Sequence, residues 1–317
     1  MMTPSSQLLT LPVKAAARLL ALALLEEIQR AQQRLDNPED TEALHDFRVA
    51  LRRLRSCLRA YKPYLKESLS KTMRRQLREL AAATRTSRDI EVQLAWLHKQ
   101  LSRLGARQRI GAHRMLQQLE DRKTVADREL HRYITTTFSH IQARLKRRLS
   151  SYTVTVCLHK SSHEESYAEV AAKQTVQLGQ PLQQHLSKIQ SITDEQEAHQ
   201  ARIAGKHLRY QLEPFAESLE GGAMLIERLE SLQDLLGDLH DAQMLIHEIV
   251  IARQQWRGEA QEIGGLTALV NQLRKFNQQT FAKLEADWLD EHGNDFFTTL
   301  HDVAKNLLKL SGAQIEV

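Results

Sequence analysis

Residues 45–61 read HDFRVALRRLRSCLRAY, and residues 199–215 read HQARIAGKHLRYQLEPF. The two stretches match position by position at a shift of 154 residues, because a histidine, cations and apolar side chains recur in the same order. The matched pairs are His45 with His199, Arg48 with Arg202, Arg52 with Lys206, Arg55 with Arg209 and Tyr61 with Phe215. A shift of 152 also brings Asp89 onto Asp241. This duplication predicts one helical plan used twice in the chain.

Each stretch separates its cations from its apolar residues when it is drawn as a helix. At about 100° per residue, the basic positions of the first stretch fall within about 80°, and the apolar positions centre about 120° away. The first basic stripe consists of His45, Arg48, Arg52, Arg55 and Arg59, and the second of His199, Arg202, Lys206 and Arg209. Like charges one turn apart repel each other, so an anion is expected to face them. Guanidinium groups rising about 5.4 Å per turn favour a chain of phosphates over one small anion.

The other reading of such a stripe is a solvated face whose cations are paired with nearby acids. Its repetition weighs against that reading, since the second stretch keeps four basic or histidine positions in an acidic half of the chain. Four more cations lie on the helix expected next and extend the predicted site. They are Arg74, Arg78, Arg85 and Arg88.

Apolar residues at spacings of three and four run through almost the whole chain, which predicts an all-α protein. The predicted helices cover residues 12–35, 38–61, 67–104 and 106–149, and then 164–192, 194–219, 223–257 and 266–310. An interruption is expected at Gly179-Gln180-Pro181, and the β-branched, helix-poor stretch that begins at Ser150 is expected to connect the halves. The predicted domains are therefore two helical bundles, residues 1–158 and 159–317.

Charge is divided unequally between these halves of the 317-residue chain. Residues 1–158 carry 30 Lys+Arg and 15 Asp+Glu, whereas residues 159–317 carry 14 and 24. The excess of cations points to an anionic partner held mainly by the first half. Two cysteines are too few for a disulfide framework, and the apolar run Leu19–Leu25 is too short for a membrane span, so we expect a cytoplasmic protein.

The duplicated stretches resemble the CHAD family, the conserved histidine α-helical domain. The resemblance rests on His45-x-x-Arg48-Val49-x-x-Arg52-Arg53-x-Arg55 and on His199-x-x-Arg202-x-x-x-Lys206-x-Leu208-Arg209. Leu236-Gly237-Asp238-Leu239-His240-Asp241 and Ser87-Arg88-Asp89 are similar to the family's Leu-Gly-x-x-Arg-Asp signature. Arg85 stands where Gly237 keeps that pattern, and His240 replaces the arginine matched by Arg88, so the two halves depart from the signature at different positions.

The resemblance implies two pseudo-symmetric four-helix bundles, with a basic groove or pore between them that binds inorganic polyphosphate. It also implies a binding module without catalysis of its own, so no cofactor, metal or catalytic residue is expected. Both histidines are predicted to donate to phosphate, and a structural hydrogen bond is their other reading. Asp89 and Asp241 are predicted to orient nearby arginines.

Three alternatives come from different classes of protein. The first is an enzyme that holds Mg²⁺ over a diphosphate at a helical acidic cluster, which would consist of Asp234, Asp238 and Asp241. Basic helices also attract nucleic acid, although an aromatic content of 5% offers little base stacking. The third alternative is a scaffold that attaches to a polyphosphate granule or to a polyphosphate-metabolising enzyme.

Overall fold

The computed structural model describes residues 6–35, 37, 40, 42–151, 164–255, 260–290 and 292–310. All regular elements in these ranges are helical, which confirms the predicted all-α class. The predicted connection between the halves lies almost wholly outside the described residues, as does Cys157.

The first half contains six α-helices and one π-helical turn among the described residues. They are α1 (Ser6–Thr10), α2 (Val13–Arg34), α3 (Ala43–Ala60), α4 (Lys71–Leu101), α5 (Ala106–Tyr133), η1 (Ile134–Phe138) and α6 (Ser139–Ser150). The predicted break near Gly105 is confirmed, because this residue caps the start of α5.

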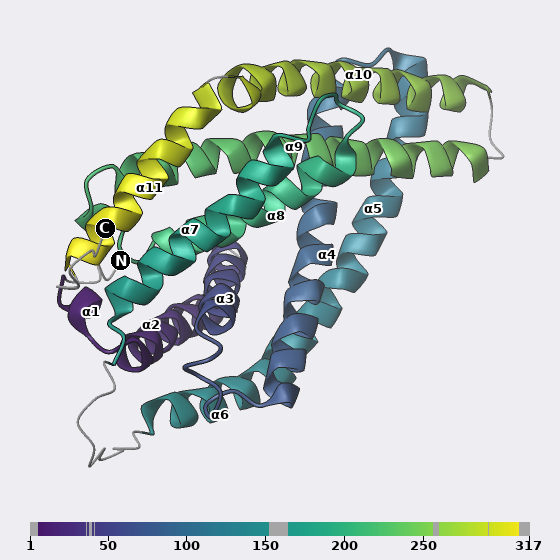
Figure 1. Ribbon diagram of the computed structural model, residues 1–317. Helices are drawn as coiled ribbons and strands as arrows, with labels where there is room; N and C mark the ends of the chain where they lie inside the picture. The colour runs from purple at the N-terminus through teal and green to yellow at the C-terminus, as the bar shows by residue number, and fades with distance from the viewer. Residues whose placement is uncertain are drawn as a thin grey trace.

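The described part of the second half repeats this order (Figure 1). Its elements are α7 (Tyr167–Leu186), α8 (Glu195–Leu212), η2 (Ala216–Ser218), α9 (Gly222–Gln255), α10 (Ala260–Leu284), η3 (Glu285–Leu289) and α11 (His292–Leu310). The π-helical turns η1 and η3 bend the chain at corresponding places, between α5 and α6 and between α10 and α11. The duplication therefore extends to a local irregularity of the backbone.

Several predicted helix limits were wrong: the helix expected at 164–192 ends at Leu186, and the helix expected from residue 266 begins at Ala260. The helix of residues 194–219 ends at Leu212, because Pro214 restricts the preceding backbone and has no N–H to donate. The expected interruption near Pro181 does not occur, since α7 continues through this residue to Leu186. Gly179 lies in the same turn, where a Cβ atom would come 2.5 Å from Leu300 Cδ2, so the glycine allows α7 to lie close to α11.

The starts of α2 and α7 lie side by side. Val13 N–H donates to the Glu165 carbonyl at 3.1 Å, and Tyr167 N–H donates to the Leu11 carbonyl at 2.8 Å. At the shift of 154 residues, exchanging the halves turns one bond into the other. The backbone at this point thus has the local two-fold relation that a duplicated helical plan allows.

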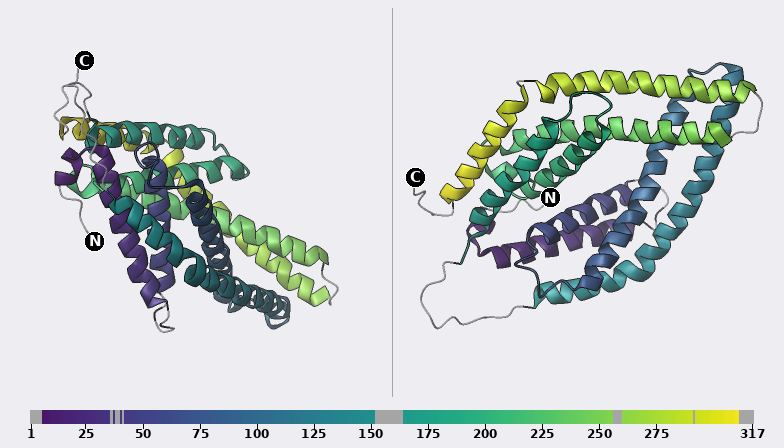
Figure 2. Two further views of the ribbon diagram at one scale, coloured as in Figure 1. Left: turned by 90° about the horizontal axis from the view of Figure 1, so that it is seen from below. Right: turned by 45° about the vertical axis from the view of Figure 1, so that its right-hand side comes forward.

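A large hydrophobic core joins α2, α3, α7, α8 and α11 with parts of α4 and α9. A second core forms where the α4–α5 pair meets the α9–α10 pair, and it contains Leu97, Leu119, Ile249 and Leu273 (Figures 1 and 2). Each core draws on both halves of the chain. The boundary predicted near residue 158 therefore divides two copies of a helical plan that share their cores.

Candidate functional site

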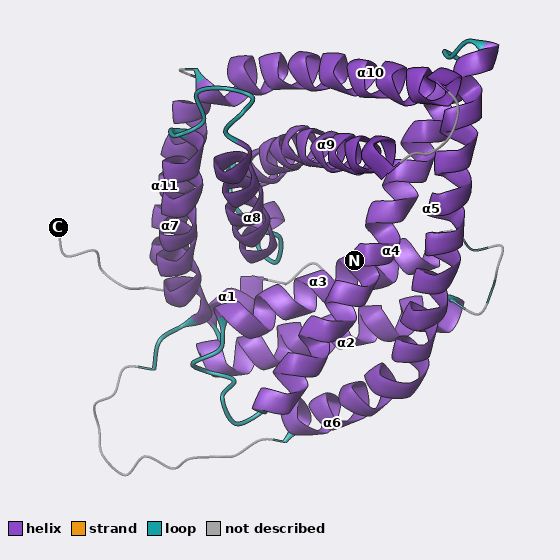
Figure 3. Cartoon of the chain, turned by 90° about the vertical axis from the view of Figure 1, so that its right-hand side faces the viewer, coloured by secondary structure: helices purple, strands orange, loops and turns teal. Residues whose placement is uncertain are grey.

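Helices α3 and α8 pack against each other near the middle of the molecule, inside the outline of α5, α6, α10 and α11 in Figure 3. On α3 the apolar stripe is buried, as predicted, and includes Phe47, Leu51, Leu54 and Leu58. Between the two helices, Arg53 Nε donates to Glu213 Oε2 at 2.7 Å. Burial of the apolar faces thus orients the basic faces, and this ion pair links the two halves.

Five cations from both halves form what we call the central basic cluster. They are Arg52 and Arg55 on α3, Arg85 on α4, and Arg202 and Lys206 on α8. Arg52 and Arg85 both act electrostatically on Arg202, and Arg85 also acts on Arg55. Across the described part of the chain, none of the five forms an ion pair with a carboxylate. The cluster therefore holds uncompensated positive charge.

Burial and crowding weaken the proton affinity of the cluster. Burial and the charges of Arg202 and Arg52 lower the pKa of Lys206 to about 7, against the weaker opposing effect of Asp241. Burial likewise lowers the pKa of Arg202 and of Arg55. Bringing an anion next to these groups would reverse the shift, because an opposite charge favours the protonated form.

Two acids act electrostatically on the cluster, Asp89 of α4 and Asp241 of α9. Both favour the charged form of Arg202. Burial and the neighbouring Asp241 raise the pKa of Asp89. This placement is consistent with the predicted role of both acids in orienting arginines. Two carboxylates against five cations still leave the cluster positive.

Gly237 of α9 lies beneath Arg202. A Cβ atom on this glycine would be 3.7 Å from Arg202 Nε and 3.8 Å from its Nη2, so the guanidinium covers this part of the helix closely. The corresponding position of α4 is Arg85. Where Gly237 leaves room for a guanidinium, Arg85 adds a cation to the cluster. The departure from the repeated pattern thus gives each half a different part of the site.

Arg48 was predicted as a ligand, and the structure surrounds it with other partners. Its side chain is only 8% exposed, and its Nη1 donates to Glu91 Oε2 at 2.8 Å while its Nη2 donates to Ser87 Oγ at 2.9 Å. Ser87 Oγ in turn donates to Asp127 Oδ1 at 2.6 Å. Arg48 therefore joins α3 to α4 and α5, and both of its terminal nitrogens are engaged, although its buried Nε has no hydrogen-bond partner among the described residues.

Arg209 is also engaged, this time by acids of its own half. Its Nη1 donates to Glu230 Oε1 at 3.0 Å, and its Nε lies 3.4 Å from Glu213 Oε1. Its counterpart Arg55 faces Arg59 and Arg78, which occupy the positions that correspond to Glu213 and Glu230. The same site in the repeat thus contains an ion-paired arginine in one half and a group of like charges in the other.

The two predicted histidines differ in their surroundings. His199 is half-buried against His240, with 5.1 Å between ring centroids, and its Nδ1 is buried without a hydrogen-bond partner in the described structure. Burial, followed by the charges of Arg202 and Arg85, lowers the pKa of His199. His45 is exposed on α3, seven residues or about 10 Å of helix before Arg52. Only His199 is brought against the central cluster.

Comparison with known proteins gives this arrangement a family. The family model for the CHAD domain matches residues 19–250. The chain belongs to the CHAD domain family. A solved CHAD domain from the plant Ricinus communis is similar at 21% identity with a TM-score of 0.61, covering 91% of each chain. PptA from Streptomyces chartreusis is similar at 19% identity with a TM-score of 0.62, covering 86% of this chain and 100% of that one. No curated protein matches.

Among the other cations predicted for the CHAD site, Arg78 and Arg59 act on Arg55, and Arg88 acts on Asp89. Arg74 lies at the start of α4, where its Nη2 donates to the Leu69 carbonyl at 3.0 Å. Two histidines that the sequence analysis did not select, His207 and His240, lie beside the cluster. His207 directly follows Lys206 in the sequence but is not part of the predicted basic stripe. Its position beside the cluster is evident only from the packing of α8 against α3.

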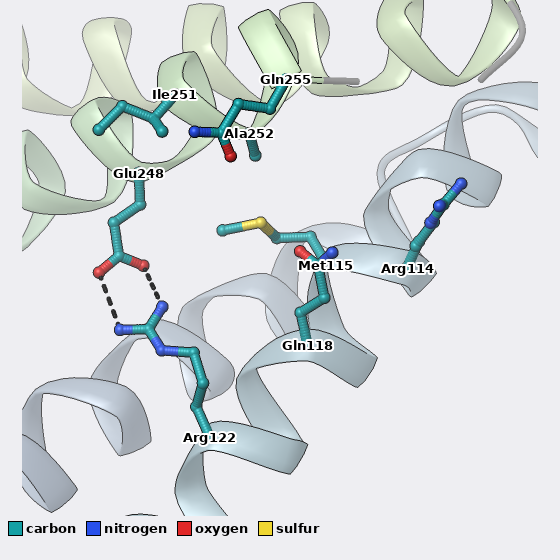
Figure 4. Close-up of a pocket in the computed structure, with 8 residues that line it drawn as sticks. All are labelled: Arg114, Met115, Gln118, Arg122, Glu248, Ile251, Ala252 and Gln255. Atoms are coloured by element: carbon teal, nitrogen blue, oxygen red, sulfur yellow. Dashed lines mark hydrogen bonds and ion pairs between the residues drawn. The ribbon is translucent and has the colours of Figure 1, made fainter. Parts of the chain in front are cut away.

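A pocket of about 500 Å³ lies between α5 and α9, away from every residue predicted for the CHAD site. Figure 4 shows Arg122 reaching Glu248 across it, with Nη1 and Nη2 at 3.1 and 3.4 Å from the two carboxylate oxygens. A second pocket of about 370 Å³ lies between α3, α7 and α8, and Arg59 and His207 line it. Of these two pockets, the second adjoins the basic cluster, because its lining residue His207 is acted on by the charges of Arg55 and Lys206.

Neither a membrane-spanning helix nor a metal-binding group of three His, Cys, Asp or Glu residues occurs among the described residues. In the acidic group of α9, burial raises the pKa of Asp238, and the charges of Asp241 and Asp234 raise it further.

Proposed function

We propose that this CHAD protein binds inorganic polyphosphate at the central basic cluster. The observation that carries the proposal is the set of five cations, drawn from α3, α4 and α8 of both halves, without an ion-paired carboxylate in the described structure. Assembling such a cluster costs electrostatic free energy, which a polyanion returns on binding.

Arg52, Arg55, Arg202 and Lys206 are proposed to contact phosphate directly, together with Arg85. Arg59 continues the α3 row for another turn beyond Arg55, so the cations extend over about 10 Å from Arg52. A row of this length matches several linked phosphates better than one orthophosphate. Arg48 and Arg209 are assigned a supporting role, because carboxylates hold their guanidinium groups.

His199 is proposed to donate to a phosphate oxygen, since its ring lies against the cluster and its Nδ1 has no hydrogen-bond partner within the described residues. We place His45 at the edge of the same surface. The proposal covers binding without catalysis, in a cytoplasmic protein, and attachment to polyphosphate granules would follow from the same site.

A binding titration with long-chain polyphosphate tests the proposal, with triphosphate, single-stranded DNA and double-stranded DNA as competitors at matched salt. Replacing Arg52, Arg202 and Lys206 together by Gln is expected to weaken polyphosphate binding about 100-fold or more, since each charged contact contributes about 1.5–3 kcal/mol. A control variant replaces Lys62, Lys66 and Lys71, which are exposed and outside the cluster, and should change affinity less than about threefold.

Affinity should also fall steeply as salt rises and should increase with chain length. Retained binding in the triple cluster variant would refute the proposed site. Equal affinity for polyphosphate and for DNA would instead indicate a generic polyanion site, and phosphate release from bound polymer would contradict the assignment of binding alone.

A further inference from the structure

The pocket between α3, α7 and α8 lies where the basic row of α3 ends. Arg59 is the last cation of that row, and it lines the pocket together with His207 of α8. His207 senses the charges of Arg59, Arg55 and Lys206, so the pocket adjoins the central basic cluster. A polyphosphate chain that follows the row from Arg52 to Arg59 therefore reaches this pocket.

The walls of the pocket are fixed by hydrogen bonds between helices. Gln174 Nε2 of α7 donates to the Ala60 carbonyl of α3 at 2.8 Å, and Gln211 Nε2 of α8 donates to Tyr61 Oη at 2.6 Å. Leu178 of α7 also lines the pocket. Helix α7 thus forms one wall of the pocket at the end of the basic row, and it supplies no cation to the lining.

The two ionisable groups of the pocket suit a particular kind of phosphate. In the described structure Arg59 forms no ion pair and His207 has no hydrogen-bond partner. Burial, then the charges of Arg59 and Arg55, lower the pKa of His207 to about 4, so its imidazole is neutral at neutral pH. A neutral imidazole has one donor and one acceptor, whereas arginine only donates.

A terminal phosphoryl group differs from an internal one in two respects. It has three non-bridging oxygens, and its last proton has a pKa of about 6 in phosphate monoesters. Arg59 suits the oxygens through paired N–H donors, and a neutral His207 can accept a hydrogen bond from the remaining P–OH or donate one to the dianion. Internal phosphates have no such proton to share.

We propose that the α3–α7–α8 pocket binds the terminal phosphoryl group of a phosphate chain. This inference rests on the proposed polyphosphate function and adds to it a defined end and direction for the bound polymer. The shared chemistry would also admit the terminal phosphate of a nucleoside triphosphate, so the test must separate the two sources.

The experiment compares, on the full chain, polyphosphate of defined length with free ends and the same polymer whose ends are blocked as phosphoramidates with a small amine. Free-ended chains are expected to bind about tenfold more tightly, as one charge-assisted contact would give. Arg59→Gln and Leu178→Trp should each reduce this ratio to about one. Leu178→Trp fills the pocket without changing charge, and Lys62→Gln is a matched control that removes an exposed cation outside the pocket.

Equal binding of free and blocked ends by the unaltered protein would overturn the inference while leaving polyphosphate binding intact. Failure to bind either polymer would instead refute the proposed function. Triphosphate and ATP are tested in parallel as competitors of polyphosphate. If ATP binds no more tightly than triphosphate, the result supports a chain-end site. ATP binding more than about tenfold tighter would assign the pocket to a nucleotide and overturn it.

Discussion

The Nη1 atom of Arg48 lies 2.8 Å from Glu91 Oε2, whereas Arg202, its counterpart in the second half, forms no ion pair within the described residues. The positions that hold Arg48 explain the difference. At the shift of 152, Ser87 corresponds to Leu239 and Glu91 to Gln243, so α9 has neither the hydroxyl nor the carboxylate. One arginine therefore supports the fold, and the other remains free to bind.

Arg48→Gln and Arg202→Gln should accordingly have opposite effects. Removing Arg48 leaves Glu91 and Ser87 without their partner, so the free energy of unfolding should fall by about 1–3 kcal/mol. Removing Arg202 relieves repulsion with Arg52 and Arg85 and should leave stability unchanged or slightly higher. Urea unfolding measures the first effect. Polyphosphate titration should show about tenfold weaker binding for Arg202→Gln and a change under threefold for folded Arg48→Gln; the reverse ranking would contradict these roles.

The contrast between Arg55 and Arg209 yields a gain-of-function prediction. Glu230 pairs with Arg209, and the corresponding residue of the first half is Arg78, which adds to the charge around Arg55. Glu230→Arg should release Arg209 from one acid and add a cation, raising polyphosphate affinity about threefold to tenfold at low salt. Glu227→Arg, which adds the same charge one turn earlier on α9, is the control. The prediction fails if both variants raise affinity equally.

Lys206 predicts a pH dependence of binding. Its folded-state pKa of about 7 lies below that of a free lysine, so the side chain loses its proton as pH rises through neutrality. A bound polyanion favours the charged form, and binding above pH 7 must therefore take up a proton. The charges of Arg202, Arg52 and Arg209 act on Lys206 against the opposing effect of Asp241, and affinity should fall between pH 7 and 9, by at most about tenfold per unit.

Long-chain polyphosphate suits this measurement because its titrating ends are few. His199 and His240, whose pKa values are lowered by burial, are already neutral in this range. Lys206→Arg keeps the charge at all these pH values and should flatten the profile. A fall of equal slope in this variant would show that another group titrates.

Gly237 provides a test of the space beneath Arg202. An alanine Cβ would be 3.7 Å from Arg202 Nε, an ordinary contact, so Gly237→Ala should raise the free energy of unfolding by about 0.5–1 kcal/mol through helix propensity. Its polyphosphate affinity should change less than about twofold. Gly237→Leu should displace the guanidinium and weaken binding about tenfold while the helix content stays constant. Equal affinities in the two variants would show that Arg202 does not depend on this space.

Gly179 and Gly264 form a matched pair for the packing of α7 on α11. A Cβ at Gly179 would approach Leu300 Cδ2 to 2.5 Å, and Leu300 is itself buried, so Gly179→Ala should lower the free energy of unfolding by about 1 kcal/mol or more. Among the described residues, and apart from the backbone of its own helix, nothing lies within 4 Å of an ideal Cβ at Gly264, so Gly264→Ala should stabilise α10 by about 0.5–1 kcal/mol. Thermal unfolding distinguishes the two, and stabilisation by both would contradict the close α7–α11 contact.

Much of the fold could be predicted because its signals are local. Apolar residues at helical spacing predict helices whatever they pack against, and the duplicated stretches set the register of the repeat. That register recurs in three dimensions: Tyr61 and Phe215, aligned in sequence, both contact Tyr167, with ring centroids at 5.4 and 6.3 Å. The predicted two-bundle division and the basic groove or pore stay predictions. The halves share both cores, and this sharing could not be predicted because it depends on contacts between residues distant in sequence.

The sequence by itself determined the helical class, the repeat, the CHAD resemblance and the separation of basic from apolar faces, because each depends on residue spacing along one helix. Only the tertiary structure decided which cations are free. Arg48 and Arg209 form ion pairs with acids on neighbouring helices, whereas Arg55 and Arg202 form none within the described residues. Both outcomes depend on which side chains α4, α5 and α9 bring near α3 and α8. Charge pairing is a property of distance in space, and a helical stripe specifies only one of the two partners.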